Sequence, residues 1–153
     1  MNQTEIQLSI PARLGFEKIA METVVSLAAL HGLPSARFSD VRTAISEACI
    51  NAMEHGNKFA RGTSVEIHMR VQRRNLQIDI LDLGKGLKGP LVQPDLQRKL
   101  AGEESPRGWG AYLIEKLVDD VHYFYHKKRN VTQLSFKLPG KRQNKINEAV
   151  PQV

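Results

Sequence analysis

The chain has 153 residues, 41% of them hydrophobic and 25% charged, which is the composition of one soluble globular domain. No apolar run approaches the ~20 residues that cross a bilayer, and the start MNQTEIQLSIPARLG lacks the basic and apolar regions of a secretory signal. The one cysteine, Cys49, has no second cysteine to pair with. We therefore expect a reduced, cytoplasmic protein without membrane contact.

The net charge of +6 raises the question of nucleic-acid binding. Much of the excess lies in three clusters, which are Arg70, Arg73 and Arg74, then Lys127, Lys128 and Arg129, then Lys141 and Arg142. These clusters fall in expected turns or in the tail, with few aromatic residues between them on which bases could stack. We expect solvated loop charge and no direct nucleic-acid contact, and the alternative is a basic face that meets an acidic protein or a nucleotide's phosphates.

The first half of the chain is predicted to form a strand and two helices. Alternating apolar residues predict a strand over residues 4–10, and helical spacing predicts a helix over residues 13–31. A second helix is expected to be capped by Ser39 or Asp40 and to finish at Gly56.

The second half is predicted to hold a hairpin, a long irregular loop, a helix and a second hairpin. The first hairpin covers residues 65–71 and 76–80, with a turn at Arg74 and Asn75. The loop covers residues 87–107 and the helix residues 107–120. The second hairpin covers residues 121–125 and 131–138. A loop of this length in a compact domain is usually functional or mobile.

Hairpins imply antiparallel pairing, and the helices lie mostly between strands. We therefore expect an α+β fold, a two-layer α/β sandwich with helices on one face of a mixed, mainly antiparallel sheet. Residues 1–140 are expected to form this domain, and residues 141–153 a polar, disordered tail.

The second helix carries a polar line of Glu47, Asn51 and His55, spaced four residues apart. On a helical wheel this line flanks the apolar stripe made by Val41, Ile45, Ala48 and Ala52. Polar groups at the edge of a core need partners such as a hydrogen-bond network, a metal or a ligand. Carboxylate and carboxamide oxygens are ligands that Mg²⁺ accepts, although polar residues at a helix edge are often only structural.

Two glycine motifs follow the polar line. In ILDLGKGL, Asp82, Gly84 and Gly86 come directly after an apolar strand. The glycines leave the backbone free to take positive φ and to approach a flat ligand. The aspartate can accept a hydrogen bond from an exocyclic amine. A plain turn is the simpler interpretation.

In RGWGAYLIEKL, Gly108 and Gly110 open a helix beside Arg107, so exposed backbone N–H groups, the helix dipole and a positive side chain favour a phosphate chain there. A helix start with permissive residues is the simpler interpretation here.

The motifs follow one another in a fixed order: a helix with Glu and Asn, a strand ending in DxGxG, a long loop and a helix opening with GxG. This order resembles the N, G1 and G2 boxes of the GHKL ATPase superfamily, the Bergerat fold. Within it, EACINAMEHGNK, ILDLGKGL and RGWGAYLIEKLVDDVHY resemble the small stand-alone anti-sigma factor serine kinases. The resemblance covers about residues 4–138.

The resemblance implies a role for each site residue, with ATP or ADP and Mg²⁺ as cofactors. Glu47 would be the catalytic base and Asn51 the magnesium ligand. Asp82 would bind the adenine amine, and Gly84 and Gly86 would line the base pocket.

At the other end of the nucleotide, the resemblance has Gly108 and Gly110 meet the phosphates, to which Arg107 adds positive charge. Thr132 would help to hold adenine through water. The loop 85–107 corresponds to the ATP lid. Trp109 and Ala111 depart from the smaller or branched residues frequent at these positions, and Trp109 can narrow the phosphate end.

The resemblance implies a serine/threonine protein kinase that acts as an anti-sigma factor. Its partners would be an anti-sigma factor antagonist, which it phosphorylates, and a sigma factor, which it binds, and similar proteins usually pair as homodimers. The alternative is a nucleotide-dependent switch that binds a partner protein without kinase activity.

Overall fold

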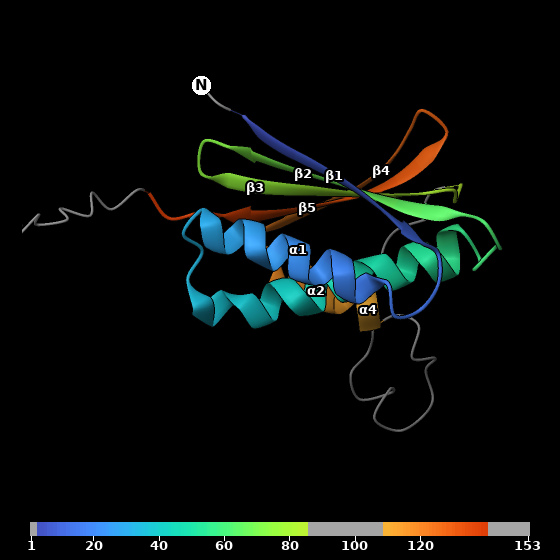
Figure 1. Cartoon of the computed structure of the whole chain (residues 1–153), viewed down its shortest axis with the longest axis horizontal. Helices are drawn as coiled ribbons and strands as arrows, with labels where there is room; N and C mark the ends of the chain where they lie inside the picture. The colour runs from blue at the N-terminus through green and yellow to red at the C-terminus, as the bar shows by residue number, and fades with distance from the viewer. Residues whose placement is uncertain (1–2, 86–108, 141–153) are drawn as a thin grey trace, which may run out of the picture.

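The computed structural model describes residues 3–85 and 109–140, which form one sheet with helices on one face (Figure 1). The strands are β1 (Thr4–Pro11), β2 (Ser64–Gln72), β3 (Asn75–Asp82), β4 (Asp120–His126) and β5 (Arg129–Lys137). They lie in the order β1-β2-β3-β5-β4 with every neighbouring pair antiparallel. The predicted α+β sandwich is confirmed, and its described sheet is antiparallel rather than mixed.

The helical layer is built around α2, which packs against both α1 and α4. The elements are α1 (Glu17–Leu30), the 3₁₀ turn η1 (Ser35–Arg37), α2 (Phe38–Asn51), the π-helical turn η2 (Ala52–Gly56) and α4 (Trp109–Leu117). Small residues on α2, Ala44 and Ala48, are fully or almost fully buried and let the neighbouring helices approach closely. Because α2 lies between α1 and α4, the side chains along its edges are held in place by the neighbouring helices.

The core lies between the helices and one face of the sheet. Alternate strand residues point into it, in accordance with the period of two in a strand: Val65, Ile67 and Met69 of β2, Leu76, Ile78 and Ile80 of β3, and Leu134 and Phe136 of β5. Cys49 on α2 is buried in the same core, and burial raises the pKa of its thiol to about 12. The thiol is therefore protonated and unreactive at neutral pH.

Two predicted helix starts are wrong by a few residues. Residues 13–16 form a turn with Gly15 at φ 101°, and the Glu17 carboxylate accepts a hydrogen bond from the Gly15 N–H at 2.6 Å, so α1 begins at Glu17. Neither Ser39 nor Asp40 caps α2, because the chain enters that helix from η1 with its backbone already helical. Asp40 instead lies in the first turn, with an ion pair to Arg37 at 3.0 Å.

The predicted strands are present with slightly longer bounds. The first hairpin pairs Gln72 with Asn75, so its two-residue turn is Arg73 and Arg74, one position earlier than predicted. Arg73 has a φ of 55°, a conformation that sequence propensity disfavours for arginine. The loop 87–107 and the tail 141–153 lie outside the described residues.

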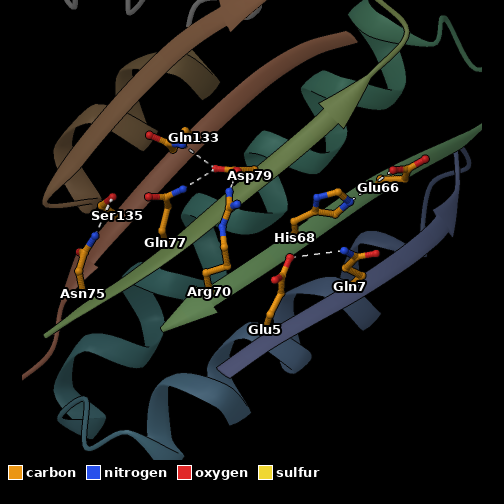
Figure 2. Close-up of polar contacts among 10 residues, drawn as sticks. All are labelled: Glu5, Gln7, Glu66, His68, Arg70, Asn75, Gln77, Asp79, Gln133 and Ser135. Carbon is orange, nitrogen blue, oxygen red and sulfur yellow. Dashed lines mark hydrogen bonds and ion pairs between the residues drawn. The ribbon is translucent and has the colours of Figure 1, made fainter. Parts of the chain in front are cut away.

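The outer face of the sheet is polar and centres on Asp79 of β3 (Figure 2). This side chain accepts hydrogen bonds from Gln77 at 3.2 Å and Gln133 at 2.8 Å, and it also pairs with Arg70. The helices cover the opposite face of the sheet, but Asp79 is still only 7% exposed. Three strands are thereby cross-linked by one carboxylate. Within residues 3–85 and 109–140, no helix has the length and hydrophobicity that a membrane span requires.

We predict that Asp79→Ala lowers the free energy of unfolding by about 1–3 kcal/mol, because it leaves Arg70 and two glutamine amides without their acceptor. Chemical denaturation measures the loss. Glu5→Ala is the matched control on the same face, since Glu5 makes only an exposed contact with Gln7 at 3.4 Å. Equal stability of the Asp79 and Glu5 variants would contradict the prediction.

Candidate functional site

The polar line predicted on the second helix is divided by the fold. Glu47 and Asn51 are half-buried on α2, whereas His55 is exposed in η2, where its imidazole lies 3.9 Å from Glu54. The helix widens at this point, because the Asn57 N–H donates to the Ala52 carbonyl at 2.9 Å, the bond of a π-helical turn. Such turns are frequent at functional sites.

The start of α4 lies directly against Glu47 and Asn51. A Cβ added to the buried Gly110 would lie 2.8 Å from Glu47 Oε2 and 3.2 Å from both amide atoms of Asn51. Only a residue without a side chain leaves both polar groups in place. Two segments far apart in the sequence thus bring a carboxylate, a carboxamide and a helix start together.

Asp82 lies at the end of β3 and is only 2% exposed. Its Oδ1 accepts a hydrogen bond from the Gly84 N–H at 2.7 Å, and its Oδ2 accepts one from the Asn130 side-chain amide at 3.1 Å. Burial raises the pKa of Asp82 above its usual value, and these two hydrogen bonds, with weaker effects of Arg129 and His55, oppose the rise.

Glycines bring the backbone close to this carboxyl group. A Cβ on Gly56 of η2 would overlap the side chain of Asp82, and one on Gly84 would lie 2.8 Å from Asp82 Oδ1 and 3.1 Å from Gly56 Cα. The described glycines with positive φ are Gly15, Gly32 and Gly62, so Gly84 serves close approach and not an unusual backbone angle. For Gly84 the prediction of positive φ is wrong, because close contact and not φ requires this glycine.

Thr132 lies on the same face as Asp82. In the β3–β5 pairing Thr132 is opposite Ile80 and Asn130 is opposite Asp82, and cross-strand partners point to one side of a sheet. Next to them on β4, burial raises the pKa of Tyr123 to about 12, and its hydroxyl and Asn130 Oδ1 are buried without a hydrogen-bond partner. Buried polar atoms without partners are rare and suit a ligand.

Two residues that sequence reasoning did not single out hold this site together. The side chain of buried Asn57 accepts from the Leu83 N–H at 2.9 Å and donates to the Ser64 carbonyl at 2.9 Å, so it joins η2, β2 and the turn after β3. Asn130 orients Asp82 from β5. The sequence EHGNK offers a signal for Asn57 only as a helix end, and none for Asn130.

Three of the predicted site residues, Gly86, Arg107 and Gly108, lie outside the described residues. Trp109 and Ala111, the departures from the family pattern, are both half-buried at the start of α4. The indole ring of Trp109 packs edge-to-face on Tyr112, with ring centroids 5.9 Å apart.

The arrangement fits a magnesium-bound nucleotide. Among the described residues, no group of three or more His, Cys, Asp or Glu side chains could hold a metal by itself. Asn51 supplies one hard oxygen ligand, which suits Mg²⁺ because this ion keeps several waters and takes further oxygens from phosphates. Gly110 lets the backbone at the start of α4 approach the side chains of both Glu47 and Asn51 closely.

Comparisons with known proteins show the family of the chain. The sequence matches the histidine kinase-like ATPase domain over residues 10–136. It is 28% identical over 145 residues to the serine-protein kinase RsbW of Bacillus subtilis, covering 92% of this chain and 90% of that protein. It is 30% identical over 129 residues to RsbW of Bacillus pumilus, covering 79% of this chain and 80% of that protein.

A solved structure shares the fold. The crystal structure of the RsbU and RsbW domains of a Mycobacterium tuberculosis protein superimposes with a TM-score of 0.62 at 18% identity. The match covers 88% of this chain, which spans 32% of that longer one. With the family match over most of its length, the chain belongs to the histidine kinase-like ATPase family, in the group of the RsbW serine-protein kinases.

Proposed function

We propose that the protein is an ATP-dependent serine/threonine protein kinase that acts as an anti-sigma factor. It phosphorylates an anti-sigma factor antagonist, binds a sigma factor, and works as a cytoplasmic homodimer. The observation that carries the proposal is the close contact of Gly110 with Glu47 and Asn51. A separate segment of the chain supplies the buried carboxyl group of Asp82. The names of the RsbW relatives support the kinase activity.

The two groups of residues bind opposite ends of the nucleotide. Asp82 accepts a hydrogen bond from the adenine amine, with Thr132 beside it on β5 and Gly84 allowing the flat base to approach. Gly86 would extend this base pocket. The phosphates would lie at the start of α4 near Gly110, and Gly108 and the positive charge of Arg107 would add to their binding.

Glu47 and Asn51 act at the γ-phosphate. A magnesium ion held by Asn51 and the phosphates supplies charge neutralisation when bound. Glu47 orients the substrate's serine or threonine hydroxyl and takes its proton, while the hydroxyl oxygen bonds to the γ-phosphorus. The bond from that phosphorus to the bridging oxygen breaks, and ADP leaves. The helical spacing of Glu47 and Asn51 places the base beside the metal ligand.

ATP with Mg²⁺ is expected to raise the melting temperature of the wild-type protein and not that of Asn51→Ala. Ligand at a hundred times its dissociation constant contributes about 2.7 kcal/mol, which is several degrees for a domain of this size. Asn75→Ala, on the opposite face of the sheet, is the matched control and keeps the shift. Absence of any shift in the wild type with ATP or ADP would remove the nucleotide site from the proposal.

Glu47→Ala is expected to lose about 10²- to 10⁴-fold in the rate of phosphate transfer to a candidate antagonist, because the general base is gone. The magnesium-dependent melting shift with ATP remains. Glu115→Ala, an exposed carboxylate on α4, is the control and transfers phosphate at the wild-type rate. If wild-type protein binds nucleotide and the antagonist but never transfers phosphate, the binding switch without kinase activity is the correct function.

Asp82→Asn is expected to lose nucleotide binding but to be at least as stable as the wild type at neutral pH without ligand. The raised pKa of Asp82 means that its ionised form is disfavoured in the fold, so the wild type carries this cost above that pKa. As the pH falls and the carboxyl group is protonated, the advantage of the asparagine variant shrinks. Thermal melts at several pH values measure the difference, and a variant clearly less stable at neutral pH would contradict the prediction.

A further inference from the structure

A second cleft, of about 590 Å³, lies between the end of β1 and the loop that precedes β2. We call it the basic cleft; residues 11–14 and 59–63 line it. The Ala12 N–H donates to the Thr63 carbonyl at 3.0 Å, which holds the two segments together. None of the residues assigned to the nucleotide lines the basic cleft, so it is a feature separate from that site.

The charges in the basic cleft are all positive. Arg13 and Arg61 line it, Lys58 precedes it, and no acidic residue is among its lining residues. Within the described part of the chain, none of these three cations forms an ion pair with an acid. The guanidinium of Arg13 lies 5.0 Å from the centre of the Phe16 ring, which orients it without neutralising it.

The cleft also exposes large apolar side chains. Leu14 is 61% exposed and Phe59 is 42% exposed. Lys58 and Phe59 both have left-handed backbone angles, with φ of 52° and 51°, although neither is glycine. Such strain persists only where other contacts impose it and is most frequent at functional sites. Here the Phe59 N–H donates to the Met53 carbonyl at 2.9 Å, which holds the backbone at this position.

We propose that the basic cleft docks an acidic segment of a partner protein, in which carboxylates flank a large apolar side chain. The unpaired cations would meet the carboxylates, and Leu14 and Phe59 would cover the apolar side chain. A nucleic acid is a poorer fit, because it needs several stacking aromatic rings or a longer row of cations and the cleft has one exposed ring. Docking requires no phosphoryl transfer, and it adds to the proposed binding of protein partners a defined surface and the chemistry of one contact.

The basic cleft is physically connected to the nucleotide site. The loop that carries Phe59 begins at Asn57, whose side chain binds the Leu83 N–H one residue after Asp82. The loop of the basic cleft is therefore joined by one hydrogen bond to the turn that follows Asp82.

The test is to select from a phage-displayed library of random dodecapeptides on the full-length protein and to measure binding of the enriched peptides by fluorescence anisotropy. Enriched peptides are expected to combine Asp or Glu with a large apolar residue. The double variant Arg13→Glu with Arg61→Glu should weaken their binding at least about ten-fold, since like charges then face each other. Phe59→Asn should also weaken it, and asparagine tolerates the left-handed backbone at this position.

The matched control is Arg73→Glu with Arg74→Glu, an equal change of charge in the β2–β3 turn, which should leave peptide binding unchanged. A single-stranded dodecanucleotide and vesicles of phosphatidylserine and phosphatidylcholine are tested in parallel. The proposal is overturned if no peptide is enriched, if the peptides lack carboxylates, if they bind all variants equally, or if only the oligonucleotide or the vesicles lose binding in the double variant.

Melting shifts with ATP and Mg²⁺, measured on the same variants, separate this proposal from the kinase function. Weaker peptide binding with an intact nucleotide shift supports a separate docking site. A wild-type protein that binds peptides as expected and shows no nucleotide shift would contradict the proposed kinase and leave the docking site standing.

Discussion

The burial of the Asp82 carboxyl group is the constraint on which the site depends. A carboxylate away from water is costly unless donors surround it, and here a backbone N–H and an asparagine amide do so. Their geometry requires the turn after β3 and strand β5 to meet at one point, and it requires glycine at position 56. The raised pKa shows that the compensation is incomplete. A ligand that donates a further hydrogen bond would complete it.

The sheet separates two kinds of polar interaction. On the helical side, the polar residues of the candidate site lie where α2, η2 and the end of β3 come together. On the outer side, the Asp79 network joins β2, β3 and β5 and adds to the contacts that hold their register. Because the antiparallel ladder aligns Asn130 with Asp82, this register decides which side chain stands beside the buried carboxyl group.

Much of the fold was predictable because periodicity reports burial directly. The alternation in β2 and β3 and the helical spacing in α1 and α2 predict these elements, and the two layers follow from them. The errors lie where local rules were overridden: Gly15 turns the chain before α1, and Arg73 takes a left-handed angle that no propensity favours.

For the site, the motif order grouped Glu47 and Asn51 with Gly110, and the fold brings them together. The supporting residues were not predictable in the same way. Asn130 and Asp82 are 48 positions apart and meet only through strand pairing, and Asn57 acts on Leu83 from 26 positions away. A single sequence carries no local signal for such contacts, whereas the residues that face a nucleotide recur in motifs.

Cys49 has a practical consequence for work in solution. Its thiol is buried and protonated at neutral pH, so alkylating reagents leave the folded native chain unlabelled. A cysteine introduced at an exposed position such as Leu14 would then be the one reactive thiol among the described residues. A spin label or fluorophore can therefore be attached to the folded chain without first removing the native cysteine and creating a cavity beneath α2.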